Sequence, residues 1–167
     1  NAFVSKAFTK AFASIPVVLA SVNSTAEADA VTVRVRYPSK TSFQVGMREQ
    51  ESSRQSHKSE RVDFIAWEPS AGEFNGMSYQ VGRTTNVVTD KSHTLIYQTP
   101  FDAPPMFIAK MQTTNNGDTA ALRWANRDEA SLQLRVTEEQ SKDTEVAHPA
   151  ESVGYLLLDA DAAAAPG

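Results

Sequence analysis

Hydrophobic and polar residues alternate along several stretches of the chain. Residues 30–36 place three valines on one face and a threonine with two arginines on the other. Residues 42–48 alternate in the same way with Phe43 on the apolar face, and residues 131–137 do so with Leu132. Such alternation is typical of antiparallel strands with one buried and one solvated face. We therefore expect Phe43 and Leu132 to be buried.

Four further apolar runs alternate less strictly, and we expect them to be central strands covered on both faces. They are residues 17–22, 62–67, 106–111 and 153–158. Short polar segments with turn residues separate the runs, as in a β-sandwich or barrel. The polar stretch 49–58 carries no apolar stripe, so a helix is not favoured there. The pattern as a whole predicts an all-β fold.

The alternating runs recur, because residues of the first half meet similar residues of the second half at a constant offset of 89. The matched positions include Phe12 with Phe101, Pro16 with Pro105, Arg34 with Arg123, and Gln44 with Gln133. With two extra residues in the second copy, the register continues through His57 with His148 and Glu60 with Glu151. A repeat of this length suits a small domain used twice rather than a solenoid unit. The chain is therefore predicted to hold two tandem antiparallel β-sandwich domains.

The repeat divides the chain into parts. We expect the first sandwich in residues 1–68, a linker in residues 69–76, the second sandwich in residues 77–159 and an Ala-rich tail or linker in residues 160–167. The second copy opens with a strand at 77–83 that has no counterpart in the first, unless an upstream segment or a neighbouring chain supplies it. Units of about 80 residues bury only ~60–65% of their unfolded surface and are marginal alone. We therefore expect a homo-oligomer, or packing against neighbouring domains.

Composition excludes several classes of protein. The 167 residues are 41% hydrophobic and 22% charged, as in an ordinary globular protein. The net charge of -4 argues against nucleic acid or an anionic membrane as the main partner. No apolar run reaches the ~18 residues of a membrane span, and no signal peptide opens the chain. The absence of cysteine rules out disulfides, thiol nucleophiles and cysteine-bound metals. Because the first residue is Asn, we expect a mature or excised fragment.

The sequence offers little for catalysis. His57 and His148 occupy equivalent positions, and each is followed three residues later by a glutamate, Glu60 or Glu151. Such a pair can orient an imidazole or bind a metal, but a metal site needs three or four converging ligands and none are visible nearby. We interpret the pairs as polar contacts between a loop and a strand. No nucleophile elbow, phosphate-binding glycine loop or zinc-protease motif occurs. We therefore expect no enzyme, no cofactor and no metal site.

The second copy contains a distinctive series of segments. They are a glycine-containing opening strand at 79–83, the phrase Tyr-Gln-Thr-Pro-Phe-Asp-Ala-Pro-Pro at 97–105, an Arg-bearing strand at 120–125, a strand at 131–137 and a closing strand at 153–159. The first copy shows the same order from residue 8 to residue 68. In this order the copies resemble the H-type lectin domain, the small β-sandwich of snail and slime-mould agglutinins.

The resemblance implies a sugar pocket at a junction between protomers. In the family, this pocket is built from a segment of the first strand, an arginine on the third strand and a Trp-His pair after the fourth. Arg34 and Arg123 match the arginine, and Gly82 matches the glycine of the first strand, which also carries Tyr79. The resemblance further implies a three-fold assembly and a secreted or cell-surface location.

The chain departs from the family at two points. The aspartate that follows the glycine of the first strand is missing from residues 82–84. Gln-Glu at 50–51 and Glu-Gln at 139–140 stand where the Trp-His pair would fall. The implied pocket is thus only partly retained, and this loss applies above all to specificity for N-acetylgalactosamine.

Two functions follow from the sequence. The first is a noncatalytic carbohydrate-binding module of a larger, extracellular protein, and the alternative is a structural or adhesive assembly module without sugar binding. Arg34 and Arg123 fall at solvent-side positions, so we expect both on the wet face, where a guanidinium fork either binds sugar hydroxyls or pairs with an acidic neighbour. Trp124 alternates in phase with Leu122 and is expected in the core. Because no dense acidic cluster is present, glycan binding would not require calcium.

Overall fold

The structure is a computed structural model that describes residues 2–53 and 56–159. These residues form twelve strands, all paired antiparallel, and no helix. The prediction of an all-β fold is confirmed, and the described part of the stretch 49–58 contains no helix, as expected. Among the described residues there is thus no helix that could cross a membrane. The tail expected at residues 160–167 lies outside the described residues.

The first five strands form one group, which we call unit one. They are β1 (Val4–Ala7), β2 (Val17–Val22), β3 (Val31–Arg36), β4 (Ser42–Glu49) and β5 (Val62–Trp67). They make a three-stranded sheet in the order β1-β4-β3 and a two-stranded sheet β2-β5. The two sheets face each other across a core of valine and phenylalanine side chains.

The remaining strands form unit two. They are β6 (Ser70–Phe74), β7 (Met77–Arg83), β8 (His93–Ile96), β9 (Met106–Met111), β10 (Ala120–Ala125), β11 (Ser131–Glu138) and β12 (Val153–Leu158). Their sheets have the orders β10-β11-β8 and β6-β7-β12-β9. Strands β8 to β12 pair as β1 to β5 do, so β6 and β7 are additions without a counterpart in the described part of unit one.

The two units share one internal register. His93, which opens β8, lies 89 positions after Val4, and Val153, which opens β12, lies 91 positions after Val62. Hydrogen bonds outside the strands also recur, because the amide of Phe8 donates to the carbonyl of Thr41 as the amide of Tyr97 donates to that of Ala130. Residues of unit one thus have structural equivalents in unit two, at an offset of 89 up to β4 and 91 in β5.

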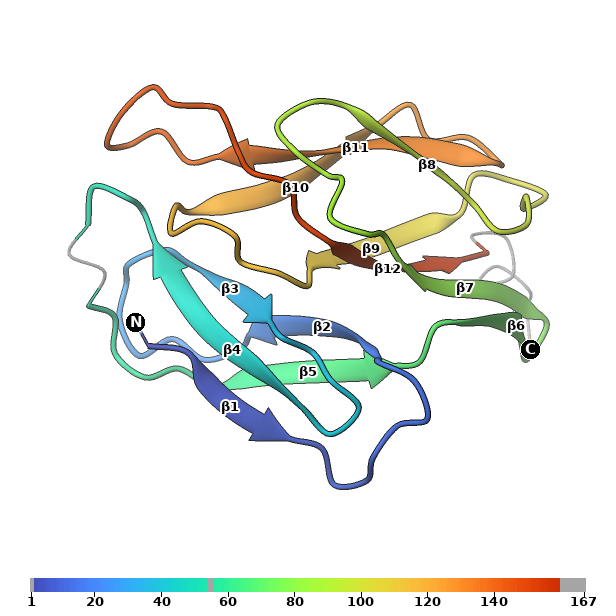
Figure 1. Ribbon diagram of the computed structural model, residues 1–167, viewed down its shortest axis with the longest axis horizontal. Coiled ribbons are helices and arrows are strands. Elements are labelled where there is room, and N and C mark those ends of the chain that lie inside the picture. Colours follow the sequence, from blue (N-terminus) through green and yellow to red (C-terminus); the bar gives the residue numbers. More distant parts are fainter. Residues whose placement is uncertain (1, 54–55, 160–167) are drawn as a thin grey trace.

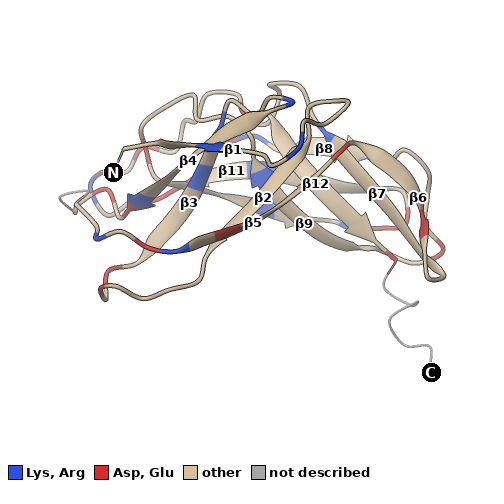
Figure 2. Cartoon of the chain, turned by 90° about the horizontal axis from the view of Figure 1, so that it is seen from below, with Lys and Arg blue, Asp and Glu red and all other residues tan. Residues whose placement is uncertain are grey.

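Figure 1 shows the sheet β10-β11-β8 at the top, the sheet β6-β7-β12-β9 beneath it, and the strands of unit one below β9 and β12. Phe43 and Leu132 are both buried in the outer cores, as predicted. A third core lies between the units, where Val17 of β2 meets Val81 of β7 and Leu156 of β12. Figure 2 shows that β7 and β12 carry no charged residue over most of their length. These two strands can therefore be buried between the units.

Two expectations about strands are wrong. The four central strands are not all covered on both faces, because Ile65 of β5 and Ile108 of β9 point outward and are exposed. The segment expected as a linker contains β6, which forms a hairpin with β7. The turn of this hairpin is Asn75-Gly76, with φ values of 52° and 78°. Positive φ at both turn positions matches the right-handed twist of the flanking strands, which is why Asn-Gly occurs there.

Candidate functional site: the junction between the units

Arg34 lies at the centre of the junction between the two units. Its position in β3 follows the alternation, since it points away from the core of unit one. It was therefore expected on the wet face, but it is only 1% exposed. The cause is unit two, whose loop between β9 and β10 covers β3; Thr114 of this loop donates to the carbonyl oxygen of Val35 at 3.3 Å. The predicted solvent exposure of Arg34 is thus wrong.

Unit two supplies the partners of the Arg34 guanidinium. Nη1 donates to the carbonyl oxygen of Asp118 at 3.0 Å, and Nη2 donates to Oε1 of Glu151 at 3.2 Å. Both side chains of this ion pair are buried, so solvent screens the pair little. Burial lowers the pKa of Arg34, and the charge of Glu151 opposes that effect. The guanidinium thus pairs across the junction and not with an acidic residue on the neighbouring strand of its own unit.

Glu151 is held by several donors besides Arg34. Its Oε1 accepts from the amide of Asn115 at 2.9 Å and contacts Nε2 of His148 at 3.2 Å, while its Oε2 accepts from the hydroxyl of Thr113. Burial alone would raise the pKa of Glu151, but the hydrogen bonds from His148, Thr113 and Asn115 and the charge of Arg34 hold that pKa below its usual value. The carboxylate is therefore stabilised in its charged form.

His148 connects Glu151 to a second buried carboxylate. Its Nδ1 lies 2.7 Å from Oε1 of Glu138, on the opposite side of the ring from Glu151. Burial would lower the pKa of His148, but the two carboxylates outweigh it and the pKa is raised. The pair His148–Glu151 is thus part of a buried network that also contains Arg34 and Glu138. It is more than the simple contact between a loop and a strand that the sequence predicted.

The junction also holds the backbone of unit one. The amide oxygen of Gln112 accepts from the amide of Val18 at 2.9 Å, and its nitrogen donates to the carbonyl oxygen of the same residue at 2.9 Å. Elsewhere the amide of Thr119 donates to Glu51 at 3.0 Å. The amide of Ser52 donates to Ser141, its equivalent in unit two, at 3.0 Å. The two units are thus in contact at equivalent positions of their sequences.

Unit one contains the same carboxylate cradle around Glu60. Oε1 of Glu60 accepts from the amide of Ala26 at 2.7 Å, and Oε2 accepts from Ser24 at 2.5 Å, as Glu151 accepts from the equivalent residues of unit two. No arginine of the described chain reaches this cradle. Instead, Nε2 of His57 lies 3.2 Å from the carbonyl oxygen of Asp29, the equivalent of Asp118. His57 thus contacts the carbonyl of Asp29 in the way that Arg34 contacts the equivalent carbonyl of Asp118.

Arg123, the equivalent of Arg34, remains exposed on β10. It lines a shallow hollow with Gln133 and Arg135 on the outer side of unit two. Trp124 beside it was expected in the core but is 49% exposed. Its phase in the strand is inward, yet no layer of the described chain covers this end of β10, whereas Val35 at the equivalent position is buried. The guanidinium of Arg127 lies 4.8 Å from the centre of the indole.

The other two predicted site residues lie on β7 at a different place. The ring of Tyr79 contacts that of Trp67 at 5.0 Å between centroids, within the core between the units. Gly82 lies opposite Tyr155 of β12, and a Cβ at Gly82 would overlap the tyrosine ring. The glycine therefore makes room for Tyr155. The structure does not bring Gly82, Tyr79, Arg34 and Arg123 together into one pocket.

The described residues contain no group of three or more His, Asp or Glu side chains arranged to hold a metal ion. The charged network of Arg34, Glu151, His148 and Glu138 is buried, so its groups face one another rather than a space that a substrate could enter. The chemistry that this arrangement provides is recognition of a guanidinium by a carboxylate. No protein-family model, no curated protein and no solved structure matches the chain.

Proposed function

We propose that this chain is a noncatalytic structural module that assembles sandwich units through the same faces that join its own two units. The observation that carries the proposal is the contrast between two equivalent arginines. Arg34 is buried against the Glu151 cradle, whereas Arg123 is exposed and the equivalent Glu60 cradle holds no arginine of the described chain. One interface is thus used within the chain, and the residues equivalent to its two halves, Arg123 and the Glu60 cradle, are not joined to each other in the described chain.

The apolar residues around the arginines follow the same rule. Val17 and Leu156, which pack together between the units, are 1% and 8% exposed. Their equivalents Met106 and Ile65 are 40% and 59% exposed. Exposed apolar residues that gather on one face mark interaction sites. Because the two halves of the interface differ, association through them is head-to-tail, giving a ring if the rotation closes and an open chain otherwise.

Sedimentation velocity over a range of concentrations tests this function. We expect the protein to self-associate, and we expect Ile65→Glu and Met106→Glu each to abolish association because each places a charge in an apolar contact. Ile96→Glu is the matched control, since Ile96 is exposed on β8, away from both halves of the interface. A protein that stays monomeric at every concentration, or an Ile96 variant that fails like the other two, contradicts the proposal.

A second candidate function is calcium-independent glycan binding at the outer face of unit two. It is favoured by the half-exposed indole of Trp124, which has the guanidinium of Arg127 4.8 Å from its centre and lines the same hollow as Arg123, because sugars bind to flat apolar surfaces edged by hydrogen-bond donors. A glycan array, read with and without a chelator, separates the two functions. Trp124→Ala and Arg123→Met should abolish any signal, whereas an array without signal leaves only assembly.

A further inference from the structure

The two closing strands differ in how their edges are paired. In unit two, β12 pairs with β9 on one edge and with β7 on the other. In unit one the equivalent strand β5 pairs with β2, and no described strand pairs with its other edge. An unpaired edge presents a row of backbone donors and acceptors that can bind another strand. In unit two, β7 occupies the position that such an added strand would take beside β5.

In unit two, β7 is held by a loop whose equivalent in unit one lies beside β5. There, Gln80 of β7 donates to the carbonyl oxygen of Thr99 at 2.5 Å, and its Oε1 accepts from the amide of Gln98 at 2.9 Å. The equivalent loop residues of unit one are Thr9 and Lys10. No described residue makes a hydrogen bond to the amides of Thr9 and Lys10 or to the carbonyl oxygen of Lys10.

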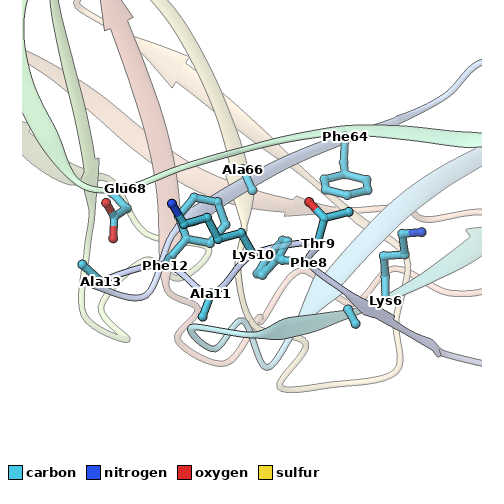
Figure 3. A pocket seen from close by; sticks show the side chains of 11 residues that line it. Lys6, Phe8, Thr9, Lys10, Ala11, Phe12, Ala13, Phe64, Ala66 and Glu68 are labelled. Carbon is cyan, nitrogen blue, oxygen red and sulfur yellow. The ribbon is translucent and has the colours of Figure 1, made fainter.

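A cavity of about 610 Å³ lies where the glutamine would enter. It is lined by residues 6–13 and by Phe64, Ala66 and Glu68. Figure 3 shows Phe64 and Ala66 extending from β5 toward the loop that carries Phe8 and Phe12. In the register of unit two, Gln80 lies opposite Leu157, the equivalent of Ala66. The cavity is therefore at the correct height along β5 for a glutamine of an added strand.

The same register defines the neighbouring positions of the added strand. Gly82 lies opposite Tyr155, the equivalent of Phe64, so the pattern of unit two places a small residue opposite Phe64. On the outer face, Tyr79 and Val81 lie opposite the equivalents of Trp67 and Ile65, both of which are exposed in unit one.

The last residue of β7, Arg83, gives the position of a basic residue in the added strand. Arg83 lies opposite Gly154, whose equivalent in unit one is the exposed Asp63. Asp63 is paired with Arg61 at 3.3 Å in unit one, so a cation at this position of an added strand would compete with Arg61 for the carboxylate. The edge of β5 thus matches a strand with the order aromatic, glutamine, apolar, glycine, basic.

We propose that the free edge of β5 binds an extended strand from another polypeptide, antiparallel, with the pattern Tyr-Gln-Val-Gly-Arg. The strand adds to the sheet β2-β5 by β-augmentation, in which backbone hydrogen bonds give affinity and alternate side chains give specificity. Its glutamine fills the cavity and binds the loop at residues 9–10. Its apolar side chains cover Ile65 and Trp67. This inference depends on the internal repeat and not on the assembly of units.

The test uses a fluorescent synthetic peptide with the sequence of residues 77–83 and the purified chain. Anisotropy should show saturable binding, and amide NMR shifts should fall on Thr9, Lys10 and residues 62–67. Replacing the peptide glutamine by alanine should weaken binding about tenfold, as expected for the loss of two or three hydrogen bonds. Replacing the peptide glycine by valine should abolish it.

A charge exchange tests the register. Asp63→Lys should weaken binding of the parent peptide and favour a peptide whose arginine is replaced by glutamate. Absence of saturable binding, equal binding of the valine peptide, or NMR shifts elsewhere on the chain would overturn the proposal. Self-association is measured without peptide, so failure of this proposal is distinguishable from failure of the proposed function.

Discussion

Replacing Arg34 with methionine should destabilise the folded chain by about 3–5 kcal/mol, because the change leaves the buried Glu151 carboxylate without its cation. The guanidinium is 1% exposed and donates two charge-assisted hydrogen bonds, so water cannot replace it without opening the junction. His148 and the hydrogen bonds from Thr113 and Asn115 remain around Glu151. We therefore expect a cost at the lower end of that range, which is still a large share of the ~5–15 kcal/mol that stabilises a typical domain.

The matched control is Arg123→Met, which makes the same chemical change at the equivalent exposed position. It should alter the free energy of unfolding by less than about 0.5 kcal/mol. Urea unfolding followed by circular dichroism measures both variants, with the m-value reporting whether the unfolding transition has changed. In the background of Glu151→Gln, the cost of Arg34→Met should shrink, because no buried charge is left behind. Equal costs for the two arginine variants would refute the assignment of Arg34 to a buried ion pair.

Three further outcomes are expected. Phe43→Ala should cost about 3–5 kcal/mol in the same urea assay, since it removes the centre of the core of unit one. Gly82→Val should lower the melting temperature, because the new side chain overlaps the ring of Tyr155, and Tyr155→Ala should restore part of the loss. The free energy of unfolding should be greatest between about pH 4.5 and 6.5. His148 has a raised pKa, so its contribution is present below its ordinary value of 6.5 and is lost as pH rises through the folded pKa. Glu151 has a lowered pKa, so its contribution is present above its ordinary value of 4.5 and is lost as pH falls through the folded pKa. His148→Gln should therefore flatten the decline toward high pH, and an unchanged decline would contradict the network.

The strands and their faces could be predicted from the sequence because alternation is a local property. A period of two requires only that one face of the strand is buried, and this placed Phe43 and Leu132 correctly. The Asn75-Gly76 turn was also readable, because Asn-Gly between two short runs is a strong hairpin signal. It lay in a segment dominated by small and polar residues, which was instead interpreted as a linker.

Alternation does not reveal what covers the outer face of a strand. Arg34 and Arg123 occupy the same position in the same pattern, yet one is buried and the other exposed, because unit two covers β3 and no described segment covers β10. The same difference separates Val35 from Trp124. Glu138 was not singled out at all, since its contact with His148 crosses between β11 and a loop that no local signal predicts. Only the arrangement of the units determines these environments.

His148 and His57 occupy equivalent positions but make different contacts, one beside a cradle that holds Arg34 and the other beside a cradle that holds no arginine of the described chain. His148 contacts Glu138 and Glu151, and this leaves the carbonyl of Asp118 to Arg34. His57 instead contacts the carbonyl oxygens of Lys58 and Asp29, with the first contact the main cause of its raised pKa. An arginine that enters the Glu60 cradle would therefore meet an imidazole already in contact with the carbonyl oxygen of Asp29. In assembly, Arg123 of one copy would compete with this imidazole for the carbonyl of Asp29 in the next. Arg34 has no such competitor, so the ion pair of Arg34 with Glu151 should be stronger than a pair of Arg123 with Glu60.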